Sequence, residues 1–258
     1  MSEIHPTAIV SPKAKIGNNI KVHPYAIIHD DVEIGNDCVI GPYAVVYNGA
    51  RIGNKVYIHQ SAVIANVPQD LKFGDEKSYV YIGDNTTIRE FVTIHRGTGE
   101  GGFSKVGENC LLMAYVHIPH DCIIGNNVIL ANTVQIAGHV EIDDNVIVGG
   151  VTAIHQFCKV GKYSMIGAAT KITQDVPPFV LTGREPMRYM GLNVIGLRRR
   201  GFSGEDISTL KKVYSIIYDS GLTLTKAKEK IAEEYGDVPS VKELLDFLQR
   251  SNRGIIRK

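Results

Sequence analysis

One position of this chain repeats every six residues over two thirds of its length, and that period restricts the fold more than any other feature. Of the 29 positions reached in steps of six from Ile4 to Ile172, only Asp70, Glu76 and Glu100 are not aliphatic. Neither an α-helix nor a simple alternating strand has a period of six. A fixed hexapeptide period is typical of a parallel β-helix, in which short strands wind around one long core.

A second position, four residues after the aliphatic one, is mostly small or β-branched, as at Ala26 and Val128. We expect both positions to point inward, where each aliphatic side chain contributes roughly 1.5–3 kcal/mol. We expect the intervening Gly and Asn residues to form the corners, where positive φ costs least. The cysteines occupy the second inward position, which predicts buried free thiols at Cys38, Cys110, Cys122 and Cys158.

Composition excludes some classes of function. The 28 Lys and Arg residues nearly balance the 27 Asp and Glu residues, so no overall charge favours nucleic acid. No apolar run approaches the roughly 18 residues of a membrane span. The segment from Met1 to Ile9 already belongs to the repeat and lacks the pattern of an export signal, which, with free thiols, favours a cytoplasmic protein.

The repeat has two interruptions, Ala65 to Tyr81 and Gly97 to Lys105, and it ends near Pro178. Both interruptions replace whole hexapeptides, and long excursions from a rigid scaffold are more often functional than structural. After a linker to about Arg200, one helical pattern follows Ser203, a second spans about Thr225 to Tyr235, and a third follows Ser240. We therefore predict a mainly β fold, with a parallel β-helix domain over residues 1–185 and a small α-helical domain over 186–258 that packs on the end of the β-helix.

Five of the nine histidines follow Ile88, and the period predicts which of them meet. If three hexapeptides form one turn, residues 18 apart stack on neighbouring coils about 4.8 Å apart. His120, Gly138 and Gln156 then share one column, Asp121 and His139 share the next, and His155 joins the same patch. An imidazole that takes a proton from an alcohol, beside a glycine N–H that stabilises an oxyanion, suits acyl transfer from an activated donor.

Two other classes of function remain open on these residues. His117 and His120, with a histidine from another coil or subunit, could hold zinc in a hydratase of the carbonic anhydrase type. A non-enzymatic scaffold is the third alternative, although it leaves the histidine cluster without a role.

Several longer motifs resemble one known family. They occur in this order: Gln69-Asp70-Leu71-Lys72, Ile94-His95-Arg96-Gly97, His117-Ile118-Pro119-His120-Asp121-Cys122, Ala137-Gly138-His139-Val140, His155-Gln156-Phe157-Cys158, Gln174-Asp175-Val176-Pro177-Pro178 and Arg200-Gly201-Phe202-Ser203. The chain closely resembles, over essentially its whole length, the UDP-N-acetylglucosamine O-acyltransferases that start bacterial lipid A synthesis. The resemblance implies a left-handed β-helix and a homotrimer with active sites between neighbouring subunits. It also implies that no cofactor or metal is needed.

The resemblance further implies the substrates and the roles of individual residues. The donor is an (R)-3-hydroxyacyl chain on acyl carrier protein, and the acceptor is the glucosamine 3-hydroxyl of UDP-N-acetylglucosamine. His120 is the general base, oriented by Asp121, and Gly138 is the oxyanion donor. The resemblance also implies that the sugar is contacted by Asp70, Lys72 and His95. The reacting groups are contacted by His117, His139 and Gln156. The nucleotide is contacted by His155, Asn193, Arg199 and Arg200.

Three positions depart from the family pattern. Ile195 stands where many members have Glu near the nucleotide, and Ala168 stands where a Gly often forms the floor of the acyl groove. We expect Ile195 to weaken contacts to the nucleoside and Ala168 to shorten the accepted chain. Pro119 replaces a small residue and is expected to stiffen His120. The acyl chain length, and the choice between a 3-hydroxyl and a 3-amino acceptor, do not follow from the sequence.

Overall fold

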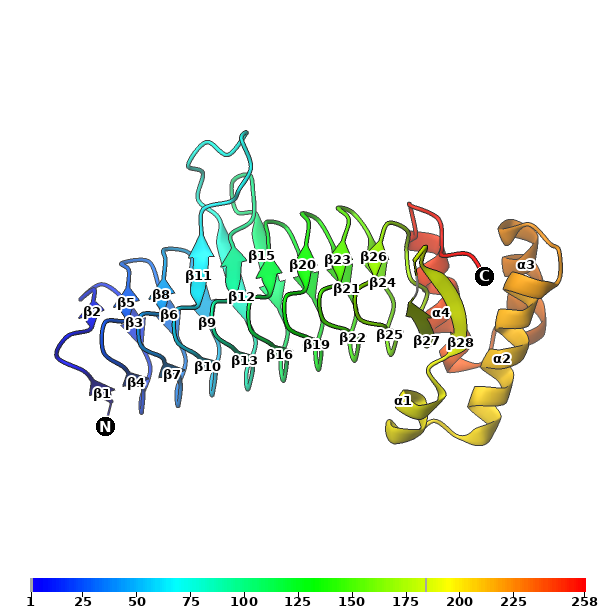
Figure 1. Ribbon diagram of the computed structural model, residues 1–258, viewed down its shortest axis with the longest axis horizontal. Coiled ribbons are helices and arrows are strands. Elements are labelled where there is room, and N and C mark those ends of the chain that lie inside the picture. The colour runs from blue at the N-terminus through cyan, green and yellow to red at the C-terminus, as the bar shows by residue number, and fades with distance from the viewer. Residues whose placement is uncertain (1, 184) are drawn as a thin grey trace.

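The computed structural model describes residues 2–183 and 185–258, and its chain winds into a long three-sided prism (Figure 1). Each coil contributes one short strand to each of three parallel sheets, so strands three apart in sequence are neighbours. Partners in adjacent regular coils lie 18 residues apart, as with Lys21 and Val39. The hexapeptide period therefore predicted the coil and its register correctly.

The three sheets, here called A, B and C, form the three sides of the prism. Sheet A contains β1 (Glu3–Ile4), β4 (Lys21–Val22), β7 (Val39–Ile40), β10 (Tyr57–Ile58), β13 (Thr87–Ile88), β16 (Leu111–Leu112), β19 (Ile129–Leu130), β22 (Ile147–Val148), β25 (Met165–Ile166), β27 (Val180–Gly183) and β28 (Arg188–Leu192). Sheet B contains β2 (Ile9–Val10), β5 (Ile27–Ile28), β8 (Val45–Val46), β11 (Val63–Asn66), β14 (Thr93–His95), β17 (His117–Ile118), β20 (Gln135–Ile136), β23 (Ala153–Ile154) and β26 (Lys171–Ile172). Sheet C contains β3 (Lys15–Ile16), β6 (Glu33–Ile34), β9 (Ala50–Ile52), β12 (Tyr79–Ile82), β15 (Phe103–Val106), β18 (Ile123–Ile124), β21 (Glu141–Ile142) and β24 (Lys159–Val160).

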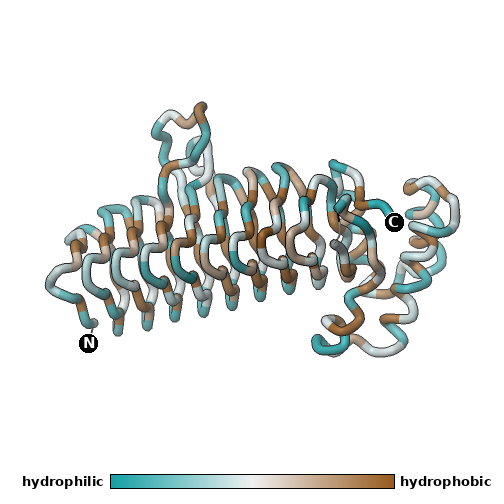
Figure 2. Tube along the Cα trace, in the orientation of Figure 1, coloured by the Kyte–Doolittle hydropathy of each residue, from teal (hydrophilic) through white to brown (hydrophobic). Residues whose placement is uncertain are grey.

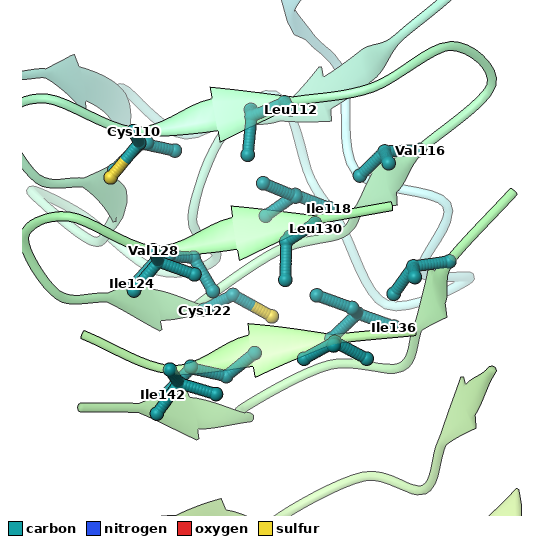
Figure 3. Close-up of a cluster of buried hydrophobic side chains, with 14 of the residues drawn as sticks. Cys110, Leu112, Val116, Ile118, Cys122, Ile124, Val128, Leu130, Ile136 and Ile142 are labelled. Carbon is teal, nitrogen blue, oxygen red and sulfur yellow. The ribbon is translucent and has the colours of Figure 1, made fainter. Parts of the chain in front are cut away.

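The core runs along the axis of the prism, as the regular recurrence of hydrophobic residues along the coils indicates (Figure 2). Both inward positions of the hexapeptide are buried: Leu112 and Ile118 pack with Val116 and Cys122 in the same interior (Figure 3). All four cysteines are buried free thiols, as expected. Burial raises the pKa of the Cys122 thiol to about 12, so it acts as a small apolar side chain.

The corners correct one expectation about glycine. The residue with positive φ is the third after the inward aliphatic, and it includes Asn19, Tyr25 and Asp37. Gly35, directly after Ile34, lacks positive φ; a Cβ there would lie 2.6 Å from the Gly53 carbonyl oxygen. Glycine at this position is therefore needed for the close approach of successive coils, whereas Asn, Asp and even Tyr accept the left-handed corner.

The three corners of the prism differ in chemistry. The corner between sheets C and A is polar, with Asn or Asp in most coils. The corner between sheets A and B carries exposed apolar side chains, among which Tyr25 stacks on Tyr43 and Phe91 stacks on Tyr115: Tyr25, Tyr43, Phe91, Tyr115 and Val151. The corner between sheets B and C carries Asp121, His139 and Phe157.

Two loops project beside sheets B and C (Figure 1). The first loop, residues 67–78, joins β11 to β12, and the second loop, residues 96–102, joins β14 to β15. Backbone hydrogen bonds join their bases, from Gly101 N to Lys77 O (2.8 Å) and from Tyr79 N to Gly102 O (2.9 Å). Both interruptions of the repeat are therefore excursions from the corner between sheets B and C.

The C-terminal part corrects the prediction of a linker up to Arg200. Instead, β28 pairs antiparallel with β27 at the end of sheet A, and the helix α1 (Val194–Arg199) follows. The predicted domain boundary between residues 185 and 186 falls within this hairpin and stays a prediction. The expected helices are α2 (Gly204–Asp219), α3 (Leu224–Tyr235) and α4 (Pro239–Arg250). Ser203 forms the predicted N-cap of α2, within a capping box.

The helices cover the end of the prism, as expected (Figure 1). Arg250 of α4 pairs with Glu141 at 3.1 Å and with Asp143, while Lys162 pairs with Glu243 at 3.0 Å. The buried carboxylate of Asp175 accepts hydrogen bonds from Ser251 Oγ (2.7 Å) and from the backbone N–H groups that follow it. Within the described residues, no helix combines the length and the apolar character that crossing a membrane requires.

Candidate active site

The side chains of His120 and Asp121 meet at the corner between sheets B and C. His120 Nδ1 lies 2.8 Å from Asp121 Oδ2. Since a carboxylate only accepts hydrogen bonds, the network assigns the Nδ1 proton to His120 and leaves a lone pair on Nε2. Pro119, which precedes His120, is buried and accepts a hydrogen bond from Ser104 Oγ (3.1 Å), which fixes the backbone there.

Gly138 lies directly against the His120 imidazole, one coil further on. A Cβ at Gly138 would lie 2.6 Å from His120 Cε1 and 2.8 Å from Nε2. Within the described part of the chain, the Gly138 N–H donates no hydrogen bond, whereas its carbonyl accepts one from Phe157 N (3.2 Å). The predicted stacking of the His120 imidazole on the Gly138 backbone is therefore confirmed, whereas the oxyanion role of the unpaired Gly138 N–H stays a prediction.

The second column, Asp121 and His139, is also confirmed. His139 Nε2 lies 3.8 Å from Asp121 Oδ2, and the His139 ring stacks on Phe157 at 4.7 Å. Burial raises the pKa of Asp121, but hydrogen bonds from Thr98 and His120 outweigh it, so the carboxyl pKa lies below its usual value. Asp121 is therefore ionised at neutral pH; it is hydrogen-bonded to His120 and has His139 as a second, more distant neighbour.

Two further histidines lie on the inner side of this corner. His95 is 3% exposed and its ring meets that of His117 edge-on at 5.0 Å. Burial, followed by the charges of His117 and His120, lowers the pKa of His95 to about 4. The pKa of His117 is also lowered, mainly by burial, and its Nδ1 lies 2.7 Å from Thr93 Oγ1. Both imidazoles are neutral at pH 7, which suits hydrogen bonding to an uncharged substrate better than charge pairing.

The other predicted site residues lie on three different parts of the chain. His155 and Gln156 are exposed at the His120 corner, one coil beyond Gly138. Asp70 and Lys72 lie in the first loop, whose Gln69 lines a cavity with His117 and Gln135. Asn193, the N-cap of α1, and Arg199 line an apolar cavity of about 540 Å³ on sheet A with the exposed Ile195. Arg200 lines a separate cavity with Phe202 and with Glu243 of α4. Because sheet A lies across the prism from the corner of sheets B and C, one chain brings His155 to His120 but not the other proposed nucleotide contacts, Asn193 and Arg199.

Sequence reasoning missed two neighbours of the site. Thr98 contacts Asp121 through both its N–H (3.0 Å) and its hydroxyl (2.7 Å). Arg253, on the C-terminal tail, lines a cavity of about 510 Å³ with Asp121 and His139. The only sequence signal for Thr98 is its place in an interruption of the repeat, and Arg253 lies outside the repeat altogether.

A group of three possible metal ligands also lies at this corner. His120, Asp121 and His139 each offer one ligand atom, and these atoms lie within 4.8 Å of one another. Within the residues described, His117 belongs to no group of three such ligands, so one chain does not complete the zinc site that the sequence suggested around His117 and His120.

Comparisons with known proteins agree with this fold over its full length. A family model for the second domain of UDP-N-acetylglucosamine O-acyltransferase matches residues 175–256, and the bacterial transferase hexapeptide model matches residues 13–48, 31–66 and 103–138. Acyl-[acyl-carrier-protein]–UDP-N-acetylglucosamine O-acyltransferases of Thiobacillus denitrificans and Paraburkholderia phymatum are 45% and 48% identical, each alignment covering 100% of both chains.

Solved structures give the same result. The UDP-N-acetylglucosamine acyltransferase of Francisella novicida has a TM-score of 0.97 at 38% identity, covering 99% of this chain and 94% of its own. The enzyme of Bacteroides fragilis has a TM-score of 0.96 at 46% identity, covering 99% and 100%. The predicted left-handed β-helix with a helical C-terminal part is thereby confirmed. This chain belongs to the family of acyl-[acyl-carrier-protein]–UDP-N-acetylglucosamine O-acyltransferases.

Proposed function

We propose that this enzyme transfers an (R)-3-hydroxyacyl group from acyl carrier protein to the glucosamine 3-hydroxyl of UDP-N-acetylglucosamine, the first step of lipid A synthesis. The names of the relatives support the substrates and the reaction class. One observation supports the proposed mechanism: the His120 imidazole lies against the Gly138 backbone, and its Nδ1 is hydrogen-bonded to Asp121.

In the proposed reaction, His120 Nε2 takes the proton of the acceptor hydroxyl while its oxygen attacks the thioester carbonyl carbon. Asp121 stabilises the imidazolium that forms, and the Gly138 N–H donates to the oxyanion of the tetrahedral intermediate. Collapse of the intermediate forms the ester C–O bond and breaks the C–S bond. The imidazolium then returns its proton to the departing thiolate, which restores the base and needs no cofactor.

A homotrimer is part of this proposal, and two features of the single chain support it. The proposed nucleotide contacts Asn193 and Arg199 lie on sheet A, across the prism from His120, so a complete site needs a second copy. The apolar corner with Tyr25, Tyr43 and Tyr115 offers a long surface for such a copy. That corner borders sheet B, and the other edge of sheet B carries His120. A cytoplasmic location stays a prediction.

An assay of the purified protein tests the function directly. With UDP-N-acetylglucosamine and a panel of acylated carrier proteins, we expect one 3-O-acyl nucleotide sugar per thiol released. We expect the same rate after treatment with a chelator, because the imidazole itself acts as the base. No transfer with any acyl chain length contradicts the proposal. Activity lost to the chelator and restored by zinc favours metal chemistry at His120, Asp121 and His139.

Replacement of Lys72 by alanine is expected to raise KM for the nucleotide sugar about tenfold with kcat nearly unchanged, because a charged hydrogen bond to bound substrate contributes roughly 1.5–3 kcal/mol. Lys72 is exposed in the first loop, where its N–H donates to Asp70 Oδ1 at 2.9 Å. Steady-state kinetics at saturating donor measure this change. Lys55→Ala, on the polar corner, is the control. An unchanged KM in Lys72→Ala shows that the first loop does not hold the acceptor.

A further inference from the structure

The second loop donates hydrogen bonds to both carboxylate oxygens of Asp121. The Thr98 N–H donates to Oδ1 at 3.0 Å, and the Thr98 hydroxyl donates to Oδ2 at 2.7 Å. Oδ2 is the same oxygen that faces His120 Nδ1 at 2.8 Å. Two contacts from one residue fix both the position and the plane of the carboxylate, which a single hydrogen bond does not.

Asp121 has a second imidazole within reach. His139 Nε2 lies 3.8 Å from the same Oδ2, and its ring meets the His120 ring edge-on at 5.2 Å. A carboxylate free to rotate about its side-chain torsions can shorten its contact with His139 at the expense of His120. Thr98 opposes that rotation, because both its donors hold the carboxylate in the plane that serves His120.

The loop itself is closed tightly around Thr98. A Cβ at Gly97 would lie 2.1 Å from Phe103 N, and a Cβ at Gly102 would lie 1.9 Å from the Thr98 carbonyl oxygen. No larger side chain fits at either position without displacing the backbone that presents Thr98. Glycine at the two ends of the loop therefore allows the chain to return directly into β15 while Thr98 faces Asp121.

A side chain of the first loop accepts a hydrogen bond from the backbone of the second loop. Glu76 accepts hydrogen bonds from Gly99 N at 2.9 Å and from Gly74 N at 2.6 Å. Hydrogen bonds from backbone N–H groups keep the pKa of Glu76 below its usual value, and the bond from Gly99 has the largest effect. A continuous series of contacts thus runs from the loop that carries Lys72, through Glu76 and Thr98, to Asp121.

We propose that Thr98 is a positioning residue that commits Asp121 to His120 rather than to His139, so that His120 Nε2 points to the reacting hydroxyl. This inference rests on the proposed role of His120 as base. Thr98 does not touch substrate in this proposal, and its effect therefore falls on kcat rather than on either KM.

Kinetics of two Thr98 variants test the proposal. Thr98→Val removes the hydroxyl donor and keeps the shape, and we expect kcat to fall about tenfold, as for a lost hydrogen bond to a charged group. Both KM values and the melting temperature should stay within experimental error. Thr98→Ser restores the hydroxyl and should recover most of the rate. Thr87→Val is the control, since its outward hydroxyl on β13 makes no hydrogen bond with the residues that the structure describes.

A spectroscopic measurement separates this proposal from the proposed function. With ¹⁵N-labelled histidine, the Nδ1–H of His120 should give a slowly exchanging signal in the parent and in Thr98→Ser that is lost in Thr98→Val. If the parent transfers no acyl group, the proposed function fails, yet this signal still decides the role of Thr98. An unchanged signal and rate in Thr98→Val, or equal losses in Thr98→Ser, would overturn the positioning role.

Discussion

Replacement of His120 by alanine is expected to lower kcat roughly 10³-fold, within the usual range of 10²–10⁴ for a general base. The His120 side chain is 16% exposed, and its Nδ1 faces the carboxylate of Asp121. Its Nε2 lies against the Gly138 backbone, and no other described group lies there to act as the base. His139 contacts the same carboxylate, but at 3.8 Å and from the next coil. Release of the carrier-protein thiol measures the rate.

The control for this variant is His23→Ala. His23 lies near the N-terminal end of the prism, where its side chain makes no hydrogen bond with the described residues, so its loss should leave the rate unchanged. The melting temperature of His120→Ala should match the parent, because His120 is not part of the hydrophobic core. Transfer at the parental rate in His120→Ala would remove this residue as the base.

Mixed oligomers extend the same experiment to the proposed site between subunits. If each site combines His120 from one chain with Arg199 from its neighbour, then trimers assembled from His120→Ala and Arg199→Ala chains contain some sites with both side chains. Activity should reappear on mixing two inactive proteins after dissociation and reassembly. No recovery indicates that both residues serve a site within one chain, in contradiction to their positions on opposite sides of the prism.

The sequence period predicted the part of the site that obeys the period. Steps of 18 residues correctly placed His120 against Gly138 and Asp121 against His139, because the coils from Val106 onward have no insertion. Thr98 lies 23 residues before Asp121, and part of that separation lies in the second loop. Steps of 18 residues therefore do not relate these two positions. A loop conformation depends on its own backbone torsions, which a six-residue period does not describe.

The C-terminal part shows the same limit. Helix propensity and capping predicted α2 to α4, but the residues of the β27–β28 hairpin carry no repeat, so the sequence predicts a linker there. The buried Asp175 receives donors from Ser251 and Asn252, more than 70 residues later, and no periodic signal links these positions. Likewise, glycine in the hexapeptide indicated positive φ, whereas the close packing of neighbouring coils is what requires it at Gly35.

Replacement of Gly138 by alanine is expected to lower kcat by about 10²-fold or more, the usual result of displacing a reacting group by about 1 Å. The added methyl would lie 2.6 Å from His120 Cε1, so the imidazole must move. Gly138 is not among the glycines with positive φ, so its backbone accepts alanine without strain, and the N–H of residue 138 remains. Gly204→Ala, which adds a methyl in open space, is the control.

A double-mutant cycle identifies how Gly138→Ala acts. If the methyl acts only by displacing the imidazole, Gly138→Ala should have little further effect in a His120→Ala background, where the ring that it would strike is gone. A further loss in that background shows that the methyl also hinders the thioester or its access to the N–H of residue 138. Full activity of Gly138→Ala alone would mean that His120 need not lie where the structure places it, which would remove the geometric basis for the oxyanion contact.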